Sequence, residues 1–205
     1  MAIDLWLESG EDSLSVRSFS VREGLSTVFE AVVTAVTPRG DLDLDTLVGR
    51  GAALHLRLGE GRVFRGVAAS ISLVRAEPTG LSTYEIHIAH PLWLLGQRTN
   101  YRIFQHQSVP DIVARLLGEW GLAVEWQIDA AAHPRLDYRV QYGETDLAFV
   151  SRLLEEAGIY YFFEHDKDKH TLVFADHVGG HPPIPGESTL WFLPPGGEVH
   201  EREDI

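Results

Sequence analysis

The chain reads YRVQYGETDLAFVSRLLEEAGIYYFFEH from Tyr138 to His165, and this stretch predicts a strand, a helix and a second strand with almost no residues between them. Within it, apolar side chains recur at intervals of three and four residues and therefore share one face of a helix. They are Leu147, Val150, Leu153, Leu154 and Ala157. Glu144 and Asp146 place negative charge beside the free amides of the first turn, and Gly158 stands where a left-handed residue ends a helix. The stretch predicts a helix that is buried along one face and followed directly by a strand.

A second helix is predicted upstream, over 108–120. Ser108 is a suitable N-cap because Asp111 follows three residues later, and the intervening proline is tolerated in a first turn. The apolar stripe of this helix is continuous and consists of Val109, Ile112, Val113, Leu116, Leu117 and Trp120. Gly121 ends the helix, and the residues after it alternate as in a strand. Residues 98–165 are therefore expected to form a small α/β unit.

Residues 14–89 show the period-two alternation of β-strands instead. Four sets of apolar residues alternate with other neighbours: Phe29, Ala31, Val33 and Ala35; Leu54, Leu56 and Leu58; Val67, Ala69, Ile71 and Leu73; Tyr84, Ile86 and Ile88. Between the second and third sets, Gly59-Glu60-Gly61 predicts a hairpin turn. Several strands joined by glycine-rich turns, with little helix between them, indicate an antiparallel barrel or sandwich. A barrel has the further advantage that it leaves no exposed strand edges.

The C-terminal segment changes character along its length. Its first residues, Asp166 to Lys169, form a polar turn that is expected to join a strand over 159–163 to one over 171–175 as a hairpin. Glycine and proline then crowd the chain over 179–197, where regular structure is hard to sustain. One strand is predicted inside this region, at Trp191 to Leu193.

Composition restricts the classes of function. A chain of 205 residues buries roughly 70% of the surface that its unfolded form exposes, so it needs no covalent staples. It has no cysteine, which excludes disulfides, thiolate metal sites and a cysteine nucleophile and fits folding in a reducing cytoplasm. The formal net charge of −13 argues against nucleic-acid binding, which relies on lysine and arginine at phosphates. No apolar window approaches the ~20 residues of a membrane helix, and MAIDLWLESGED has no signal-peptide pattern, so a cytoplasmic, non-membrane start is expected.

The ten histidines are the best argument for an enzyme. His165 and His170 flank the predicted hairpin turn and are expected to approach each other. Carboxylates that could complete a surface metal site with them are those of Asp166, Asp168 and Asp176. Ordinary polar residues at a turn explain the same pattern more simply.

Two further histidine pairs have spacings that do not suit a metal. His87 and His90 lie in or beside a strand, where an odd separation directs side chains to opposite faces. His177 and His181 are four residues apart, but the Val-Gly-Gly between them and the proline that follows disfavour a helix. The sequence contains neither a His-Glu-x-x-His motif nor a Gly-x-Ser-x-Gly elbow. It therefore supports neither a helical zinc site nor an activated serine.

Glycine pairs and an acidic run also have structural explanations. Gly49-Arg50-Gly51 and Gly59-Glu60-Gly61 lack the third glycine of a dinucleotide fingerprint, and there is no Gly-Lys pair for a P-loop, so both are interpreted as hairpin turns. Asp41-Leu42-Asp43-Leu44-Asp45 lacks the glycine and the distal glutamate of a calcium loop and is interpreted as a solvated edge or loop. None of these motifs predicts a cofactor.

The aromatic run Tyr160-Tyr161-Phe162-Phe163 has two interpretations. On a strand, consecutive aromatic residues face opposite sides, so burial of both faces is expected. Burial within the subunit is the simpler interpretation, and burial against an identical copy is the alternative.

Several of these stretches together resemble one family. The stretch 138–165 resembles the N-terminal, phage-tail-hub-like region of the VgrG (TssI) spike proteins of type VI secretion. The same pattern occurs in YRIFQHQSVPDIVARLL, Tyr101 to Leu117, and in HTLVFADH, His170 to His177. Weaker similarity covers VREGLSTVFEAVV from Val21 and IHIAHPLWLL from Ile86. Because the motifs follow the family's order, the resemblance extends over most of the chain.

The resemblance implies a mainly β fold with an α+β insert. It places a first antiparallel hub β-barrel at 1–97, the α/β unit at 98–165 and the beginning of a second hub barrel at 166–205. In the family, three copies form a hub whose six barrels match the hexameric ring of the secreted tube protein, Hcp. The sequence ends at Ile205, before the remainder of the second barrel, the OB-fold neck, the β-needle and any C-terminal extension of the family, as expected of a fragment or a short member.

The implied function is that of a structural spike or hub component, not an enzyme. Such a hub caps the secreted tube, joins the baseplate and is expelled when the sheath contracts. The implied partners are further copies in a homotrimer, the hexameric tube protein and baseplate proteins, with effectors or a spike-tip protein bound by other parts of the family's chains. The implied localisation is the cytoplasm during assembly, followed by secretion without a signal peptide.

Two alternatives are kept beside this interpretation. Within the structural class, the chain would serve as the hub of a phage tail or of an extracellular contractile injection particle. From another class, it would be a metal-dependent hydrolase built on His165 and His170. No catalytic, cofactor-binding or metal-binding residue is assigned, and the acidic charge fits an assembly component that docks on a basic or neutral surface.

Overall fold

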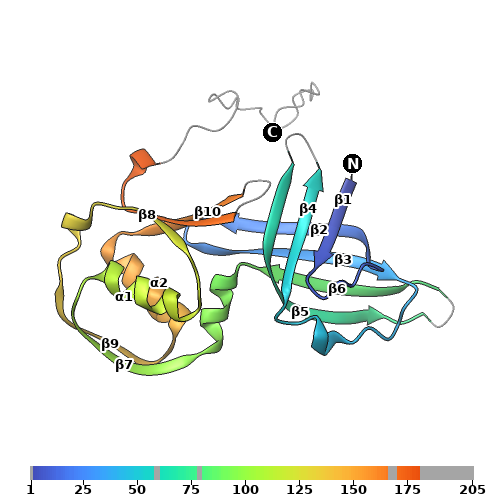
Figure 1. Cartoon of the computed structure of the whole chain (residues 1–205), viewed down its shortest axis with the longest axis horizontal. Helices are drawn as coiled ribbons and strands as arrows, with labels where there is room; N and C mark the ends of the chain where they lie inside the picture. The colour runs from blue at the N-terminus through green and yellow to red at the C-terminus, as the bar shows by residue number, and fades with distance from the viewer. Residues whose placement is uncertain (1, 58–60, 78–79, 166–169, 181–205) are drawn as a thin grey trace, which may run out of the picture.

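The computed structural model describes residues 2–57, 61–77, 80–165 and 170–180. Its largest element is a six-stranded sheet in the order β1-β4-β5-β6-β3-β2, in which every neighbouring pair is antiparallel. The strands are β1 (Ala2–Leu7), β2 (Ser15–Gly24), β3 (Thr27–Thr37), β4 (Gly51–Arg57), β5 (Arg62–Arg75) and β6 (Ser82–Ala89). The sheet curls so strongly that β1 and β4 stand at a steep angle to β2 and β3 (Figure 1). This half-barrel confirms the predicted class of a mainly antiparallel β fold.

The two ends of this sheet are β1 and β2, and no hydrogen-bonded ladder joins them in the described residues. The curvature nevertheless gathers apolar side chains on one inner surface. The buried ones include Leu7, Phe29, Ala31, Val33, Ala35, Leu54, Phe64, Ala68, Tyr84, Ile86 and Ile88. The interior therefore forms as in a barrel, but among the described residues no ladder closes the sheet, in contrast to the closure that the sequence suggested.

The alternation predicted for β3 and β6 is confirmed, but the prediction that Val67, Ala69, Ile71 and Leu73 share one side of β5 is partly wrong. A β-bulge between Ala68 and Ser70 shifts the register of β5 against β6. Phe64 and Ala68 are buried before the bulge and Ile71 after it, so the inward positions change from even to odd numbers. Leu73 lies opposite Tyr84 and therefore on the same side as Ile71, as predicted, whereas Val67 lies opposite Ala89, on the other side. One extra residue in a strand is enough to exchange its two faces.

At Gly66 two chain segments of the sheet approach each other closely. A Cβ atom at this position would lie 2.0 Å from the carbonyl oxygen of Ala89 and 3.3 Å from the amide nitrogen of His90. Ala89 is the last residue of β6, and His90 begins the turn into the 3-10 helix η2 (Pro91–Gln97). Glycine is required here because any side chain would push β5 away from the chain that leaves β6.

Gly66→Ala is expected to lower the free energy of unfolding by about 1–3 kcal/mol, the usual cost of overpacking, because the new methyl group meets backbone atoms. Gly118→Ala is the matched control. Gly118 lies in helix α1 (Val109–Glu119) with no atom within 4 Å of its Cβ position, so alanine there should be neutral or stabilise by about 0.5–1 kcal/mol. Urea unfolding at neutral pH measures both variants, and equal stabilities would contradict the assignment of Gly66.

The rest of the described chain forms a second lobe, which follows η2 (Figure 1). Its elements are β7 (Thr99–Gln107), α1, β8 (Val124–Gln127), η3 (Ala130–Ala132), β9 (Leu136–Thr145), α2 (Asp146–Ala157), β10 (Tyr160–His165), β11 (His170–Ala175) and η4 (Val178–Gly180); a short helix, η1 (Leu44–Thr46), precedes β4. In Figure 1 the two α-helices lie between a ribbon made of β7 and β9 and a sheet that contains β8 and β10. Among the described residues, no helix has the length and apolar character needed to cross a bilayer.

Both α-helices form where the sequence predicts them. Ser108 and Asp111 exchange hydrogen bonds of 3.2 Å that complete a capping box at the start of α1. Thr145 caps α2 by accepting a hydrogen bond from the amide of Ala148 at 3.1 Å, and Gly158 ends that helix with a φ of +70°. The buried residues of the two helices are Val109, Ile112, Val113, Leu116 and Leu117 in α1, and Asp146, Phe149, Val150, Leu153 and Leu154 in α2. An acidic residue in this set was not expected.

The strands β10, β11 and β8 form a three-stranded sheet in that order. β10 and β11 pair antiparallel over their whole length, which confirms the predicted hairpin, and β11 pairs parallel with β8. Several predictions fall outside the described residues. They concern Leu58, the turn at 59–60, the turn at 166–169 and the region after residue 180 with its strand at Trp191 to Leu193.

The two lobes share one continuous hydrophobic core. The amide of Ser26, in the β2–β3 turn, donates a hydrogen bond of 2.8 Å to the carbonyl oxygen of Tyr161 in β10. Beside it, the rings of Phe29 and Phe163 pack edge to face with centroids 5.4 Å apart. β10 is therefore a second connection between the six-stranded sheet and the helical lobe, in addition to η2.

Candidate functional site

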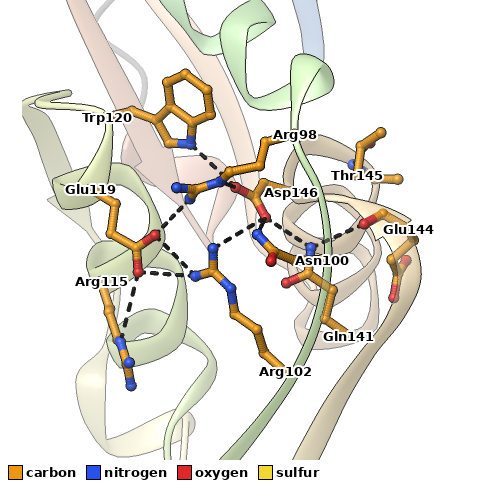
Figure 2. A network of polar contacts seen from close by, with 11 residues as sticks. Arg98, Asn100, Arg102, Arg115, Glu119, Trp120, Gln141, Glu144, Thr145 and Asp146 are labelled. Atoms are coloured by element: carbon orange, nitrogen blue, oxygen red, sulfur yellow. Dashed lines mark hydrogen bonds and ion pairs between the residues drawn. The ribbon is translucent and has the colours of Figure 1, made fainter.

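A buried carboxylate lies at the centre of the second lobe, where β7, β9 and the two helices meet (Figure 2). The side chain of Asp146 has no solvent exposure, although it stands at the first position of α2. Its oxygens accept hydrogen bonds from Arg98 Nε at 2.6 Å, Gln141 Nε2 at 2.8 Å and Trp120 Nε1 at 3.3 Å. The amide of Asp146 also donates to the carbonyl oxygen of Arg98 at 3.0 Å. One residue thus holds three segments that are distant in sequence.

Glu119 extends this network to the end of α1 (Figure 2). Its carboxylate accepts hydrogen bonds from Arg98 Nη2 at 2.6 Å and from Arg102 Nη1 at 2.9 Å. A negative charge at a helix C-terminus is normally unfavourable because the carbonyl groups there carry partial negative charge. The positive charges of the two arginines offset this unfavourable interaction. Their hydrogen bonds to Glu119 connect the end of α1 to the beginning of β7.

The protonation state of Asp146 follows from its partners. Burial disfavours the charged form and raises the pKa, but the hydrogen bonds from Gln141, Arg98 and Trp120 outweigh it and hold the pKa of Asp146 below the ordinary 3.8. The carboxylate is therefore ionised at neutral pH and has no proton to exchange. The network positions elements of the fold.

Asp146→Ala is expected to lower the free energy of unfolding by about 3–5 kcal/mol, because it leaves the buried amide of Gln141 and the partly buried guanidinium of Arg98 without their shared acceptor. Asp146→Asn keeps the shape and one acceptor oxygen, so it should fall between the alanine variant and the wild type. The control is Glu155→Ala, which removes an exposed charge from the same helix. Denaturant unfolding compares the three, and an Asp146→Ala cost no larger than that of Glu155→Ala would exclude the network as a structural clamp.

A second polar feature, the histidine cluster, consists of His90, His165 and His170. His165 and His170 pair across the β10–β11 hairpin with ring centroids 5.2 Å apart, so the predicted approach is confirmed. The His170 ring stacks on the His90 ring with centroids 4.6 Å apart. The predicted position at the surface is wrong, because the ring nitrogens of His165 and His170 are buried and without hydrogen-bond partners.

Aromatic residues surround the histidine cluster. Phe29 lies 5.3 Å from His165 and 5.5 Å from His170, and Phe64 lies 4.7 Å from His165, between ring centroids. Phe163 lies 4.5 Å from His90. The cluster therefore joins β3 and β5 of the half-barrel to the β10–β11 hairpin.

The geometry of the cluster does not correspond to a metal site. In the described residues there is no group of three or more histidine, aspartate or glutamate side chains that could hold a metal ion. The rings of His90 and His170 are nearly parallel, at 18°, instead of directing nitrogens to a common point. Asp176, an expected ligand, bonds His133 and His177 at 3.0 Å, and the other two expected carboxylates, at 166 and 168, lie outside the described residues.

The other histidine pairs are separate from this cluster. His87 faces Glu30 at 2.8 Å and Glu85 at 3.2 Å, while His90 is buried, so the two do not share a site. The Nδ1 atom of His90 accepts a hydrogen bond from the amide of Leu92 at 2.9 Å, which places the proton of the neutral ring on Nε2. His181, the partner predicted for His177, lies outside the described residues.

Burial keeps the three clustered histidines uncharged. Desolvation, followed by the mutual influence of the rings, lowers the pKa of His90 to about 3. Desolvation is also the main cause that lowers the pKa of His165 and of His170 to about 4, with smaller effects from Arg62 at His165 and from His165 and Arg65 at His170. The carboxylate of Glu23 lies 3.8 Å from Nε2 of His165. At neutral pH the cluster therefore behaves as an apolar contact.

Acid is expected to weaken the contact between the half-barrel and the β10–β11 hairpin. The folded-state pKa values lie below the ordinary 6.5, so the unfolded chain binds protons that the folded chain excludes. The contribution of the uncharged histidines to the free energy of unfolding is fully present above about pH 6.5. It is lost as the pH falls towards about 4, by roughly 1.4 kcal/mol per pH unit for each histidine. His170→Phe should therefore reduce the stability lost between pH 7 and pH 5 by about 2 kcal/mol.

Urea unfolding at both pH values measures this difference. His106→Asn is the control, because His106 is exposed and its φ of +52° is one that asparagine tolerates. An unchanged pH dependence in His170→Phe would show that the cluster is not the source of acid sensitivity.

The remaining sequence candidates have structural roles. Gly49 has a φ of +77° and Gly61 a φ of +81°, as turn residues. The acidic run 41–45 forms a loop and the start of η1, as interpreted, with Leu42 buried. Within 160–163, Tyr161 and Phe163 are buried in the core of the subunit, which favours the simpler interpretation of the aromatic run.

The sequence patterns did not predict an exposed surface on the β7–β9 ribbon, called the aromatic face here. It consists of Tyr101, Ile103, Tyr138, Val140 and Tyr142, which are 70%, 68%, 62%, 37% and 79% exposed. The register places Tyr101 opposite Tyr142 and Ile103 opposite Val140, so these side chains share one side of the ribbon. The Tyr101 and Tyr142 rings contact edge to face, with centroids 5.2 Å apart.

The aromatic face reverses the usual orientation of a strand pair. The alternating pattern in both strands would normally place the apolar set inside. Here Arg102 and Gln141 point inward to the network of Figure 2, and Phe104 is the buried apolar residue of β7. The sequence does show the alternation of tyrosine, isoleucine and valine with arginine and glutamine. Which of the two sets faces inward depends on Asp146 and Glu119, which lie elsewhere in the chain.

Comparison with known families agrees with this architecture. The family model of the phage tail baseplate hub (GPD) matches residues 22–205 of this chain. The chain belongs to this hub family. The resemblance of the chain to type VI secretion spike proteins is also confirmed. The type VI secretion system spike protein VgrG1b of Pseudomonas aeruginosa is 34% identical over 197 residues, 95% of this chain and 26% of its own length. VgrG1c of the same organism is 34% identical over 196 residues, 95% of this chain and 27% of its own length.

A solved structure shows the same hub fold. The E. coli c3393 protein, described as a component of the type VI secretion system with similarity to the T4 tail proteins gp27 and gp5, superimposes with a TM-score of 0.81 and 26% identity. The match covers 87% of this chain and 50% of that chain. The chain thus spans about a quarter of the length of the two spike proteins and half of the solved structure. The two relatives from Pseudomonas aeruginosa are spike proteins by name.

Proposed function

We propose that this chain is the hub part of a spike in a type VI secretion machine. In this role it caps the secreted tube, joins the baseplate and is expelled when the sheath contracts. The observation that carries the proposal is the hub-family match over residues 22–205, combined with 34% identity to type VI spike proteins over nearly the same span. The half-barrel and the helical lobe occur together in the c3393 structure, which supports the assignment of both parts to the hub.

The physical properties of the fold suit a part that transmits force. The six-stranded sheet is held by continuous antiparallel ladders, and both lobes share one core. The Asp146 network and the histidine cluster add internal contacts between elements that are remote in sequence. A ring of such units transmits a push without rearranging, because its connections are packed and hydrogen bonded.

The proposed partners follow from this role. They are two further copies of the chain in a homotrimer, the hexameric tube protein Hcp, and baseplate proteins. The domain division proposed with them is a first hub barrel at 1–97, the α/β unit at 98–165 and the start of a second hub barrel at 166–205. Assembly would take place in the cytoplasm, and the contractile apparatus would then secrete the hub. The hub of a phage tail or extracellular injection particle is the alternative within the same structural class.

The tube contact is directly testable. Purified chain mixed with the tube protein of the same bacterium is expected to bind to the ends of tube rings, with three chains per ring. Sedimentation gives the stoichiometry, and negative-stain electron microscopy shows whether the added density lies at ring ends. A folded chain that leaves ring ends unoccupied would contradict the proposal.

Elemental analysis of the same preparation separates the hub from the metal-dependent hydrolase. The hub requires no stoichiometric metal. A retained equivalent of zinc that is lost in His165→Ala or His170→Ala would instead favour the hydrolase.

A further inference from the structure

The histidine cluster lies where the β10–β11 hairpin meets the half-barrel. His165 is the last residue of β10, His170 is the first residue of β11, and the two form the end pair of the ladder, called the hairpin tip here. The ring of His165 contacts Phe29 of β3 and Phe64 of β5, and the ring of His170 stacks on His90 at the start of η2. The hairpin tip therefore joins the two lobes through two rings that each have a site for a proton.

The charges that face the hairpin tip do not favour a proton there. β5 contributes the positive charges of Arg62 and Arg65, and its Val63 adds a backbone group beside His165. The carboxylate of Glu23, at the end of β2, lies 3.8 Å from Nε2 of His165, but it also forms an ion pair of 2.8 Å with Arg62. The side chain of His165 is only 1% exposed, so water does not hydrate a charge on it. A protonated ring has to leave this environment to be solvated.

We propose that the hairpin tip is an acid-released latch, which leaves the half-barrel when His165 and His170 bind protons, while each lobe keeps its own fold. The two residues are at the end of the hairpin, so a movement of the tip alone brings both rings to water. The helix η2 then remains as the connection between the lobes. This inference goes beyond the proposed function and does not depend on it.

The base of the hairpin is held in the second lobe by contacts that persist in mild acid. β11 pairs with β8, and Asp176 follows β11 directly. The carboxylate of Asp176 accepts a hydrogen bond of 2.9 Å from the amide of Asp129 and lies 3.0 Å from Nε2 of His133. The hydrogen bond with His177, followed by those from His133 and Asp129, lowers the pKa of Asp176 to about 2. These bonds are therefore still present at pH 4.5, and the base stays attached when the tip is released.

The Asp146 network also persists under these conditions. Although burial opposes it, hydrogen bonding holds the pKa of Asp146 below 3.8, so the carboxylate is still ionised at pH 4.5. The second lobe thus keeps its internal connections in the range of pH in which the two histidines of the tip take up protons. The latch and the network differ because one is opened by a proton and the other has a carboxylate that resists protonation.

The direction of the pH effect follows from the two histidines. Desolvation is the main cause that lowers the pKa of each to about 4, whereas a released ring has the ordinary value of 6.5. Release is therefore favoured by up to about tenfold per pH unit for each histidine as the pH falls from 6.5 to 4. His90, whose pKa is about 3, is the last of the three to be protonated. Its Nδ1 atom still accepts the amide hydrogen of Leu92 at pH 4.5, and the start of η2 stays capped.

Hydrogen exchange of the whole chain at pH 7 and pH 4.5, read by mass spectrometry and corrected for the intrinsic rate, tests the latch. At pH 7 the amides of the hairpin tip should be protected. At pH 4.5 the amides of 162–165 and 170–172 should exchange within about tenfold of the rate of an unstructured peptide, while those of α2 stay at least about 100-fold slower. A return to pH 7 should restore the protection of the tip.

Two substitutions remove the groups that bind the protons. His165→Gln and His170→Phe should each reduce the loss of tip protection between the two pH values by at least about tenfold, and the double variant should keep its tip protected at pH 4.5. Each variant is compared with itself at two pH values, so a general loss of stability does not imitate this result. His106→Asn, which replaces an exposed histidine, is the control and should behave as the wild type does.

Nuclear magnetic resonance of the wild type gives a test without substitution. The ring signals of His165 and His170 should report protonation over the same pH range in which the tip amides lose their protection.

A hairpin tip that stays protected at pH 4.5 would overturn the latch, and so would α2 amides that lose their protection together with those of the tip. Acid release that is as large in the double variant as in the wild type would assign the effect to other groups and overturn it as well. Tube rings are absent from all of these samples, so the results bear on the latch and leave the proposed function to its own test.

Discussion

The buried negative charge of Asp146 is the constraint on which the second lobe depends. A carboxylate without water must receive hydrogen bonds from the protein, and Arg98, Gln141 and Trp120 supply them from three different elements. To reach this charge, the β7–β9 ribbon has to direct its arginine and glutamine side chains inward. Its tyrosine, isoleucine and valine side chains then have only the outer side left. The polar interior and the aromatic face are thus two results of one requirement.

The histidine cluster also consists of ionisable side chains that are buried, but these side chains are uncharged. Where Asp146 keeps its charge and recruits donors, His90, His165 and His170 lose theirs and pack with phenylalanine rings. The first solution fixes elements within the helical lobe, and the second joins that lobe to the half-barrel. Both contacts are polar in composition, yet neither is a group of side chains that could hold a metal ion in the described residues.

Local patterns in the sequence predicted the elements well, and remote contacts limited the rest. The caps at Ser108 and Gly158, the helical faces and the β10–β11 hairpin follow from neighbouring residues, so they could be read from the chain. The bulge after Ala68 could not, because one extra residue has no marker in an alternating strand. The burial of His165 and the outward direction of Tyr101 depend on residues far away in sequence, and a single sequence does not show those neighbours. Membership of the hub family was predictable because the motifs occur in order along most of the chain.

The pairing of β3 with β6 also has a consequence for how the chain reaches this state. Glu30 lies opposite Ala89 in that ladder, so a long stretch of polypeptide, including β4 and β5, must be synthesised and arranged before β3 gains this neighbour. Non-local pairings of this kind slow folding because loop closure costs entropy before any contact repays it. Until then β3, with the sequence TVFEAVVTAVT, offers a β-prone edge to other nascent chains. The strand order that makes the finished sheet rigid therefore also makes the chain most prone to aggregate while it is being synthesised and folded.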